Sequence, residues 1–173
     1  MIGSSTTGFL EQAEKTGRCF VYESSGRHST NAPPILAGLS ADICIHGHLC
    51  AGTASLECAL EGLPTLLIDR EGSPYSKLYD LPEGKVVFKD WPSAIEATLE
   101  HFNTPEGIAG FGDWSSIIND LDPFRDGKAA YRMGTYLQWL IEGFENNLDR
   151  EVIMANAAER YKKQWGEDKV ISS

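Results

Sequence analysis

The stretch ADICIHGHLCAGTASLECALEGLPTLLID, residues 41–69, decides the fold of this chain. Residues 42–45 are mainly apolar and include the β-branched Ile43 and Ile45, as in a short buried strand, and residues 63–68 form a second apolar run. Between them, residues 53–61 have the spacing of a helix that Gly62 closes. Two buried strands joined by a helix predict a parallel crossover unit, which binds ligands at the carboxyl ends of its strands.

The start of that helix predicts a binding site for a phosphate group. Gly52-Thr53-Ala54-Ser55 presents backbone N–H groups without partners inside the helix, together with the positive end of the helix dipole. Glu57 follows one turn further along, where its carboxylate could accept hydrogen bonds from sugar hydroxyls. Two plainer interpretations stay open: Thr53 or Ser55 caps the helix, and Glu57 is a solvent-exposed helical residue.

This region resembles the nucleotide-sugar-binding domain of GT-B glycosyltransferases. The resemblance is carried by Ala41-Asp42, the helix start at 52–55, Glu57 and Gly62-Leu63-Pro64. It implies that the helix start holds the diphosphate of a nucleotide sugar, that Glu57 holds the ribose, and that the turn at 69–73 faces the donor sugar. GT-B 2-epimerases and phosphorylases use similar loops, so the motif does not separate these activities.

Two further segments are similar to bacterial surface-polysaccharide biosynthesis proteins. They are GKVVFKDW at 84–91 and the long stretch from LDPFRDG to AAERY at 121–161. The resemblances together cover most of residues 18–170. They imply a role in cell-surface polysaccharide synthesis and say little about the chemistry.

The length of 173 residues is that of about one domain, whereas a GT-B enzyme has two. We therefore expect a truncated Rossmann-like half-domain at 1–103 and, at 104–173, an irregular connection followed by packed helices. The expected fold is α/β, with a partial Rossmann-like parallel sheet of about four strands, flanking helices and a C-terminal helical pair. The acceptor domain would be missing or supplied by a partner chain, and the fragment alone would be inactive.

Hydrophobic periodicity predicts the remaining elements. A helix at 8–17 has Phe9, Leu10 and Ala13 inward, and a helix at 92–102 has Ile95, Leu99 and Phe102 inward. The other expected elements are a buried strand at 19–22, a helix from 33 to 39, a strand at 86–88, a helix carrying Met133, Leu137, Leu140, Ile141 and Phe144, and a last helix with Asp149 as N-cap and Ile153, Ala157 and Tyr161 on one face.

The charge and composition of the chain limit the classes of partner that it is expected to bind. The net charge of −10 argues against nucleic acid, whose phosphates demand clustered positive charge. No apolar run has the length of a membrane span, and the N-terminus lacks the features of a signal peptide. A cytoplasmic protein is expected, with peripheral membrane association and homo-oligomerisation left open.

Five further residues are candidates for the binding site. His48 precedes the helix start and could donate to a diphosphate. Asp69, Arg70 and Glu71 follow the second strand, where Rossmann-like sheets bind ligands, although a charged surface turn explains them equally well. Arg27 lies in another loop and could border the nucleotide base.

A Cys2His2 zinc site is suggested by the alternate positions of Cys44, His46, His48 and Cys50. Alternate residues of an extended segment lie roughly 6–7 Å apart, however, and zinc ligands must lie about 2.0–2.3 Å from the ion. We therefore expect no metal, and we expect the cysteines to be reduced.

These observations predict the donor-binding portion of a glycosyltransferase, with a nucleotide diphosphate-sugar as substrate and no cofactor. No catalytic residue can be assigned from this portion. The alternatives are a 2-epimerase or phosphorylase on the same architecture, and a non-catalytic interaction module that uses residues 107–114 and the terminal helices as its partner surface.

Overall fold

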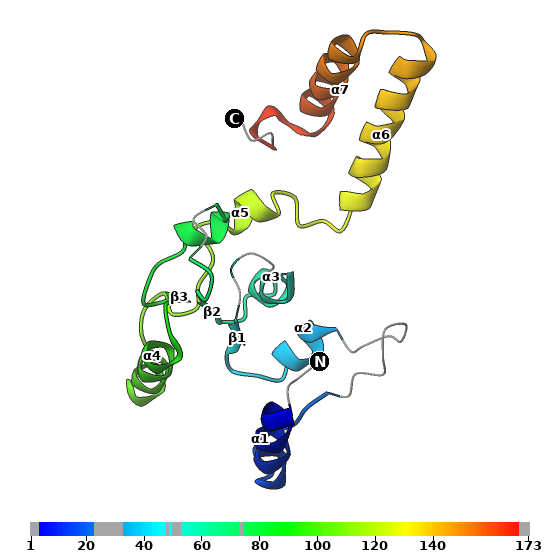
Figure 1. The fold of residues 1–173 in the computed structure, drawn as a ribbon. Coiled ribbons are helices and arrows are strands. Elements are labelled where there is room, and N and C mark those ends of the chain that lie inside the picture. Colours follow the sequence, from blue (N-terminus) through cyan, green and yellow to red (C-terminus); the bar gives the residue numbers. More distant parts are fainter. Residues whose placement is uncertain (1–3, 23–32, 48, 50–52, 73–74, 170–173) are drawn as a thin grey trace. The chain divides into compact units, whose positions relative to one another are not determined.

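The computed structural model describes residues 4–22, 33–47, 49, 53–72 and 75–169. These residues form a mixed α/β fold of two compact units (Figure 1). Unit 1 comprises residues 1–76 and 82–113, and unit 2 comprises residues 77–81 and 114–173. Most of unit 2 therefore lies after residue 113, whereas the sequence analysis placed the boundary after residue 103.

Within its described residues, unit 1 contains a parallel three-stranded sheet in the order β1-β2-β3. The strands are β1 (Cys44–His46), β2 (Thr65–Ile68) and β3 (Val87–Phe88). The helices are α1 (Ser4–Lys15), α2 (Pro34–Gly38), α3 (Thr53–Leu60) and α4 (Trp91–Asn103). The predicted crossover of strand, helix and strand at 41–69 is therefore confirmed as β1-α3-β2.

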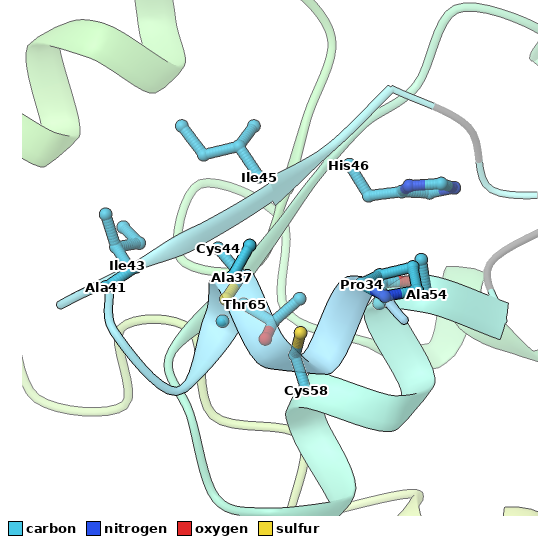
Figure 2. Close-up of a pocket in the computed structure, with 12 residues that line it drawn as sticks. Pro34, Ala37, Ala41, Ile43, Cys44, Ile45, His46, Ala54, Cys58 and Thr65 are labelled. Carbon is cyan, nitrogen blue, oxygen red and sulfur yellow. The ribbon is translucent and has the colours of Figure 1, made fainter. Parts of the chain in front are cut away.

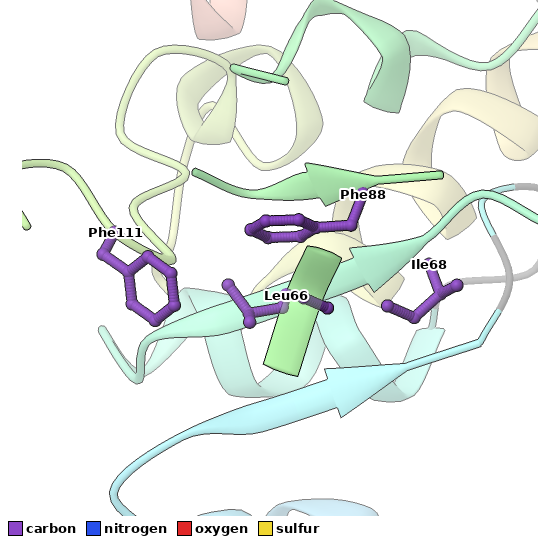
Figure 3. Packing of buried hydrophobic residues seen from close by; sticks show 5 residues of the cluster. Leu66, Ile68, Phe88 and Phe111 are labelled. Atoms are coloured by element: carbon purple, nitrogen blue, oxygen red, sulfur yellow. The ribbon is translucent and has the colours of Figure 1, made fainter. Parts of the chain in front are cut away.

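The helices divide between the two faces of the sheet. α2 and α3 pack against each other, and α3 contacts β1 and β2 (Figure 2). On the other face, Leu66 and Ile68 of β2 meet Phe88 of β3, Ala94 of α4 and the loop residue Phe111 (Figure 3). All four residues of β2 are buried, because helices cover both sides of this central strand.

The expected fourth strand is not formed. Residues 19–22 are described and have no strand partner, and Phe20 and Tyr22 are 76% and 52% exposed. Their rings instead contact each other edge to face, with centroids 5.0 Å apart. An apolar run of four residues does not distinguish a buried strand from an exposed segment, and here no neighbouring strand covers it.

The helix at 92–102 forms as α4, but the prediction of its buried face was wrong. Asp90 caps the helix by accepting a hydrogen bond from the Ser93 N–H at 2.8 Å. Ala94 is fully buried, whereas Ile95, Leu99 and Phe102 are 52–59% exposed. The small Ala94 lets the helix approach the sheet closely, so the large residues lie outward. In α1, Phe9 is likewise 73% exposed, against the expectation that it points inward.

Unit 2 is built on a pair of helices, α6 (Ala129–Glu145) and α7 (Arg150–Trp165). Ile153 and Ala157 are buried on α7 as predicted, and a Cβ on Gly143 of α6 would lie 2.7 Å from Ile153. Arg160 of α7 donates to Glu142 of α6 at 2.9 Å. The unit also contains α5 (Ile118–Leu121) and the 3₁₀ helices η1 (Lys77–Asp80) and η2 (Glu167–Lys169).

The DPFRDG segment, residues 122–127, forms a local elbow before α6. Asp126 accepts hydrogen bonds from the Arg132 guanidinium at 2.7 and 3.0 Å, which holds the pKa of Asp126 well below its usual range. Arg132 also lies 3.6 Å from the centroid of the Phe124 ring. The start of α6 is thus tied to the segment before it.

Gly112 provides a test of how unit 1 is held together. Its φ is +69°, and a Cβ there would lie 2.6 Å from the backbone nitrogen of Thr65 and 2.8 Å from Pro64. We expect Gly112→Ala to lower the free energy of unfolding by about 3–5 kcal/mol, combining left-handed strain with overpacking against immovable backbone.

Gly84 supplies the matched control for this substitution, measured by urea denaturation. Its φ is +76°, and a Cβ there would meet nothing within 4 Å. Gly84→Ala therefore introduces left-handed backbone strain without overpacking, and it should lower the free energy of unfolding by about 1–2 kcal/mol. Equal losses for the two variants would contradict the packing of Gly112 on β2.

Candidate functional site

The candidate site is a cavity of about 240 Å³ at the β1 edge of the sheet. It lies between α2, β1 and the first turns of α3, and Thr65 of β2 also lines it (Figure 2). α3 follows the carboxyl end of β1 along the chain, and β1 pairs with β2 in parallel. This is the place where parallel sheets of α/β proteins bind ligands.

Two of the predicted phosphate-binding residues line this cavity. They are Ala54, which is half-buried, and Ser55, which is 2% exposed. Thr53 begins α3 and is exposed. These three residues form the first turn of α3, where the positive end of the helix dipole lies.

Glu57 does not line the cavity. Ala54 and Cys58 are four residues apart and share the helix face that does, whereas Glu57 lies roughly 100° around the helix from that face. Its side chain is exposed, as are those of Thr53 and Glu61. A ligand that reaches both the cavity and Glu57 must therefore extend around the start of α3.

The polar groups of the cavity are few, and most of its lining is apolar. His46 at the end of β1 is half-buried, and Thr65 donates its hydroxyl to the Leu63 carbonyl at 2.9 Å. Neither Lys nor Arg is among the described residues that line it. Among the described residues, the positive potential at the cavity therefore comes from the start of α3.

Two thiols that the sequence analysis did not assign to the site also line the cavity. A Cβ on Gly38 of α2 would lie 2.8 Å from the Sγ of Cys58 and 3.4 Å from the Sγ of Cys44. Burial raises the pKa of Cys58 to about 11, with further contributions from its hydrogen bond to Cys44, from the charge of Cys44 and from the charge of Glu57. The raised pKa shows that this side of the cavity disfavours negative charge.

Asp69, Arg70 and Glu71 form a turn at the carboxyl end of β2. One carboxylate oxygen of Asp69 accepts hydrogen bonds from the backbone N–H groups of Glu71 at 3.1 Å and Gly72 at 2.9 Å. Arg70 and Glu71 are exposed. The carboxylate of Asp69 thus shapes the turn itself, as a structural turn would require.

The remaining predicted residues, Arg27, His48 and Gly52, lie outside the described residues, and so does Cys50 of the zinc alternative. Within the part of the chain that the structure describes, no three His, Cys, Asp or Glu side chains gather as a metal site. The sequence analysis did not predict that α2 lines the cavity, because no sequence pattern shows where a five-residue helix packs.

Comparison with known proteins finds no family model, curated protein or solved structure that matches the chain. Its class is therefore defined by its own fold and cavity: a mixed α/β protein with a parallel sheet and a mainly apolar cavity beside a helix start. Among the described helices, none combines the length and the hydropathy needed to cross a bilayer.

The buried thiol gives a prediction about pH. The folded-state pKa of Cys58, about 11, is higher than its ordinary value of 9.0. The stability that this shift contributes is thus fully present below about pH 9 and is lost as the pH rises towards 11. We expect the stability difference between the wild type and Cys58→Ala to shrink across this window.

The measurement is urea denaturation of both proteins at several pH values between 7 and 11. Lysine and tyrosine side chains titrate in both proteins, so their contributions cancel in the difference. A difference that stays constant up to pH 11 would show that Cys58 ionises normally in the folded protein.

Proposed function

We propose that this chain is the nucleotide-sugar-binding portion of a glycosyltransferase of GT-B type. In this proposal, β1-α3-β2 belongs to a Rossmann-like domain, and the diphosphate of the donor binds at the start of α3. The observation that carries the proposal is the position of that helix start, at the carboxyl end of a parallel strand and beside a cavity of about 240 Å³.

The chemistry of the cavity is consistent with a diphosphate at its mouth. The N–H groups of the first turn of α3 can donate hydrogen bonds to phosphate oxygens, and the hydroxyl of Ser55 lies on the same turn. Negative charge is disfavoured deeper in the cavity, beside the thiols of Cys44 and Cys58. An anion there would lose its hydration without gaining a cation from the described lining residues. The diphosphate would therefore lie at the helix start, and a neutral part of the ligand would enter the cavity.

Glu57 would bind the ribose hydroxyls on the outer side of α3. Its exposure leaves the carboxylate accessible, and a nucleotide that bends around the helix start could reach it. His48, Arg27 and the turn at 69–71 stay proposed contacts of the diphosphate, the base and the donor sugar, respectively. The donor is a substrate, and the proposal requires neither cofactor nor metal.

Transfer of the sugar would be assisted by stabilising the departing diphosphate at the helix start. The acceptor domain would come from a preceding segment or a partner chain, so this chain alone would bind the donor without transferring it. The resemblance of residues 84–91 and 121–161 supports a place in cell-surface polysaccharide synthesis, in the cytoplasm. A 2-epimerase or phosphorylase would use the same donor-binding contacts.

A non-catalytic interaction module remains the second candidate, because α4 and α6 expose rows of large apolar side chains. The predicted partner surface at 107–114 needs correction, however. Phe111 is 5% exposed and stacks on His101, and Gly112 packs on the backbone of Pro64 and Thr65. Phe111 therefore belongs to the core of unit 1, and the rows of exposed large apolar side chains among the described residues lie on α4 and α6.

The diphosphate contact is tested at Ala54. Ala54→Asp introduces a negative charge where the helix dipole favours it, so the fold should persist, but the charge would repel a diphosphate. We expect calorimetry to show binding of UDP, GDP or ADP, and of pyrophosphate, that is weakened at least about tenfold in this variant. Ala54→Asn is the control for size. Failure of the wild-type chain to bind any of these ligands would end the proposal.

The ribose contact is tested at Glu57. We expect Glu57→Gln to weaken nucleoside diphosphate binding by about tenfold, or about 1.4 kcal/mol, because a hydrogen bond to a charged acceptor becomes a neutral one. Pyrophosphate, which has no ribose, should bind both proteins equally. Glu61→Gln, at an exposed position just beyond the end of α3, is the matched control. A loss of pyrophosphate affinity in Glu57→Gln would assign Glu57 to a different role.

A further inference from the structure

Two free thiols from different elements of unit 1 line the same cavity. Cys44 lies on β1 and Cys58 lies on α3 (Figure 2). His46, two residues along the strand from Cys44, and Ala54, four residues before Cys58 on the helix, also line it. Side chains two apart on a strand, or four apart on a helix, share one face of that element. The cavity-facing sides of β1 and α3 therefore each carry one thiol.

The two sulfur atoms lie close together, against a point of α2 that has no side chain. A Cβ on Gly38 would lie 2.8 Å from the Sγ of Cys58 and 3.4 Å from the Sγ of Cys44. The two sulfurs are thus no further apart than the sum of these distances, and the thiols are hydrogen-bonded to each other. Thiols in such contact have only a short distance to close when a disulfide bond forms.

The two thiols differ in exposure and in acidity. Cys58 is 5% exposed, whereas Cys44 is half-buried. Burial, followed by the hydrogen bond to Cys44, raises the pKa of Cys58 to about 11. Because the thiolate is the reactive form of cysteine, Cys58 is a poor nucleophile at neutral pH. Cys44 is therefore the sulfur that a reagent in the cavity attacks first.

A disulfide bond suits this pair better than a metal ion does. Structural zinc sites take four ligands, and within the described ranges no three His, Cys, Asp or Glu side chains are placed to hold an ion. Thiolate ligands also carry negative charge, and neither Lys nor Arg is among the described lining residues. A disulfide is uncharged, so the mainly apolar cavity accommodates it without a buried, unbalanced charge.

The size and lining of the cavity also favour one class of oxidant. A cavity of about 240 Å³ with a mainly apolar lining admits a small uncharged molecule more readily than a charged peptide disulfide. Hydrogen peroxide is small and uncharged, and it oxidises a cysteine thiolate to a sulfenic acid that condenses with a second thiol.

We propose that Cys44 and Cys58 form a peroxide-sensitive site, in which the two thiols are converted reversibly into a disulfide bond between β1 and α3. The site does not depend on the binding of a nucleotide sugar.

The reaction has two steps. The Cys44 thiolate attacks one oxygen of hydrogen peroxide, the O–O bond breaks, and the departing hydroxide takes up the proton that Cys44 released and becomes water. The sulfur of Cys58 then attacks the Cys44 sulfur, the S–O bond breaks, and the second hydroxide leaves with the Cys58 proton as water. Two electrons pass from the thiol pair to the peroxide, and a dithiol reductant reverses the change by thiol–disulfide exchange.

The bond is tested on the reduced full chain by treatment with hydrogen peroxide, alkylation of the remaining thiols and mass spectrometry. The chain has four cysteines, so the reduced protein should take up four alkyl groups and the oxidised protein two fewer. Cleavage after glutamate separates Cys44 from Cys58, because Glu57 lies between them. We expect a pair of peptides linked through these two cysteines, which dithiothreitol separates.

Single serine variants assign the role of each sulfur. Cys58→Ser should lose the link and accumulate a sulfenic acid on Cys44, which dimedone traps. Cys44→Ser should lose the link without that sulfenic acid. Cys19→Ser and Cys50→Ser are the matched controls and should give the same linked peptides as the wild type. The peptide map uses the wild-type chain, so it remains informative even if a variant does not fold.

Urea denaturation shows whether the folded protein accommodates the bond. A link between residues 44 and 58 restricts the unfolded chain, so the oxidised wild type should unfold at a higher urea concentration than the reduced protein. Dithiothreitol should restore the reduced midpoint. Cys58→Ser treated with peroxide should show no rise, because it cannot form the link.

Three results would overturn the proposal. The first is a wild-type chain that still takes up four alkyl groups after peroxide treatment. The second is a link that Cys50→Ser abolishes, because the bond would then involve Cys50. The third is a lower urea midpoint after oxidation, because the bond would then form only by distorting β1 and α3. Nucleotide binding is measured separately, so neither proposal stands or falls with the other.

Discussion

The burial of β2 is the constraint on which unit 1 depends. A strand with both faces covered has no access to water, so each of its backbone polar groups needs a partner from the protein. The Cys44 N–H donates to the Pro64 carbonyl just before β2, and the Leu67 N–H donates to the Val86 carbonyl, both at 2.8 Å. The Gly112 carbonyl accepts from the Thr65 N–H at 3.0 Å. Three segments far apart in the chain therefore converge on β2.

The position of the cavity follows from this convergence. Among the described strands, β1 pairs with β2 alone. The cavity lies between β1, α2 and the start of α3. Gly38 lets α2 approach the thiol of Cys58 closely, and the small side chain of Ala54 lines the cavity at the start of α3. Because apolar surroundings strengthen electrostatic interactions, a few backbone dipoles at the start of α3 can decide which charge the cavity mouth accepts.

The sequence predicted the elements that its periodicity defines, and it was less informative about what those elements face. The crossover at 41–69 is recognisable because two apolar runs flank one helical pattern. Residues 19–22 have a similar apolar run, but no strand partner, which is a tertiary property that no local pattern records. In the site, Ala54 and Ser55 line the cavity, whereas Glu57 does not, since its angle on the helix separates it from them. The thiol pair depends on how α2 packs, so the sequence could not show it.

The helices α4 and α6 show why periodicity left the buried face undetermined. Each helix has a row of large apolar residues and a second face with a small residue, Ala94 in α4 and Gly143 in α6. The small residue decides the packing, because it lets the helix backbone come close to its neighbour and buries more contacts per residue. The row of large residues is then left on the outside, where it costs solvation free energy unless another surface covers it.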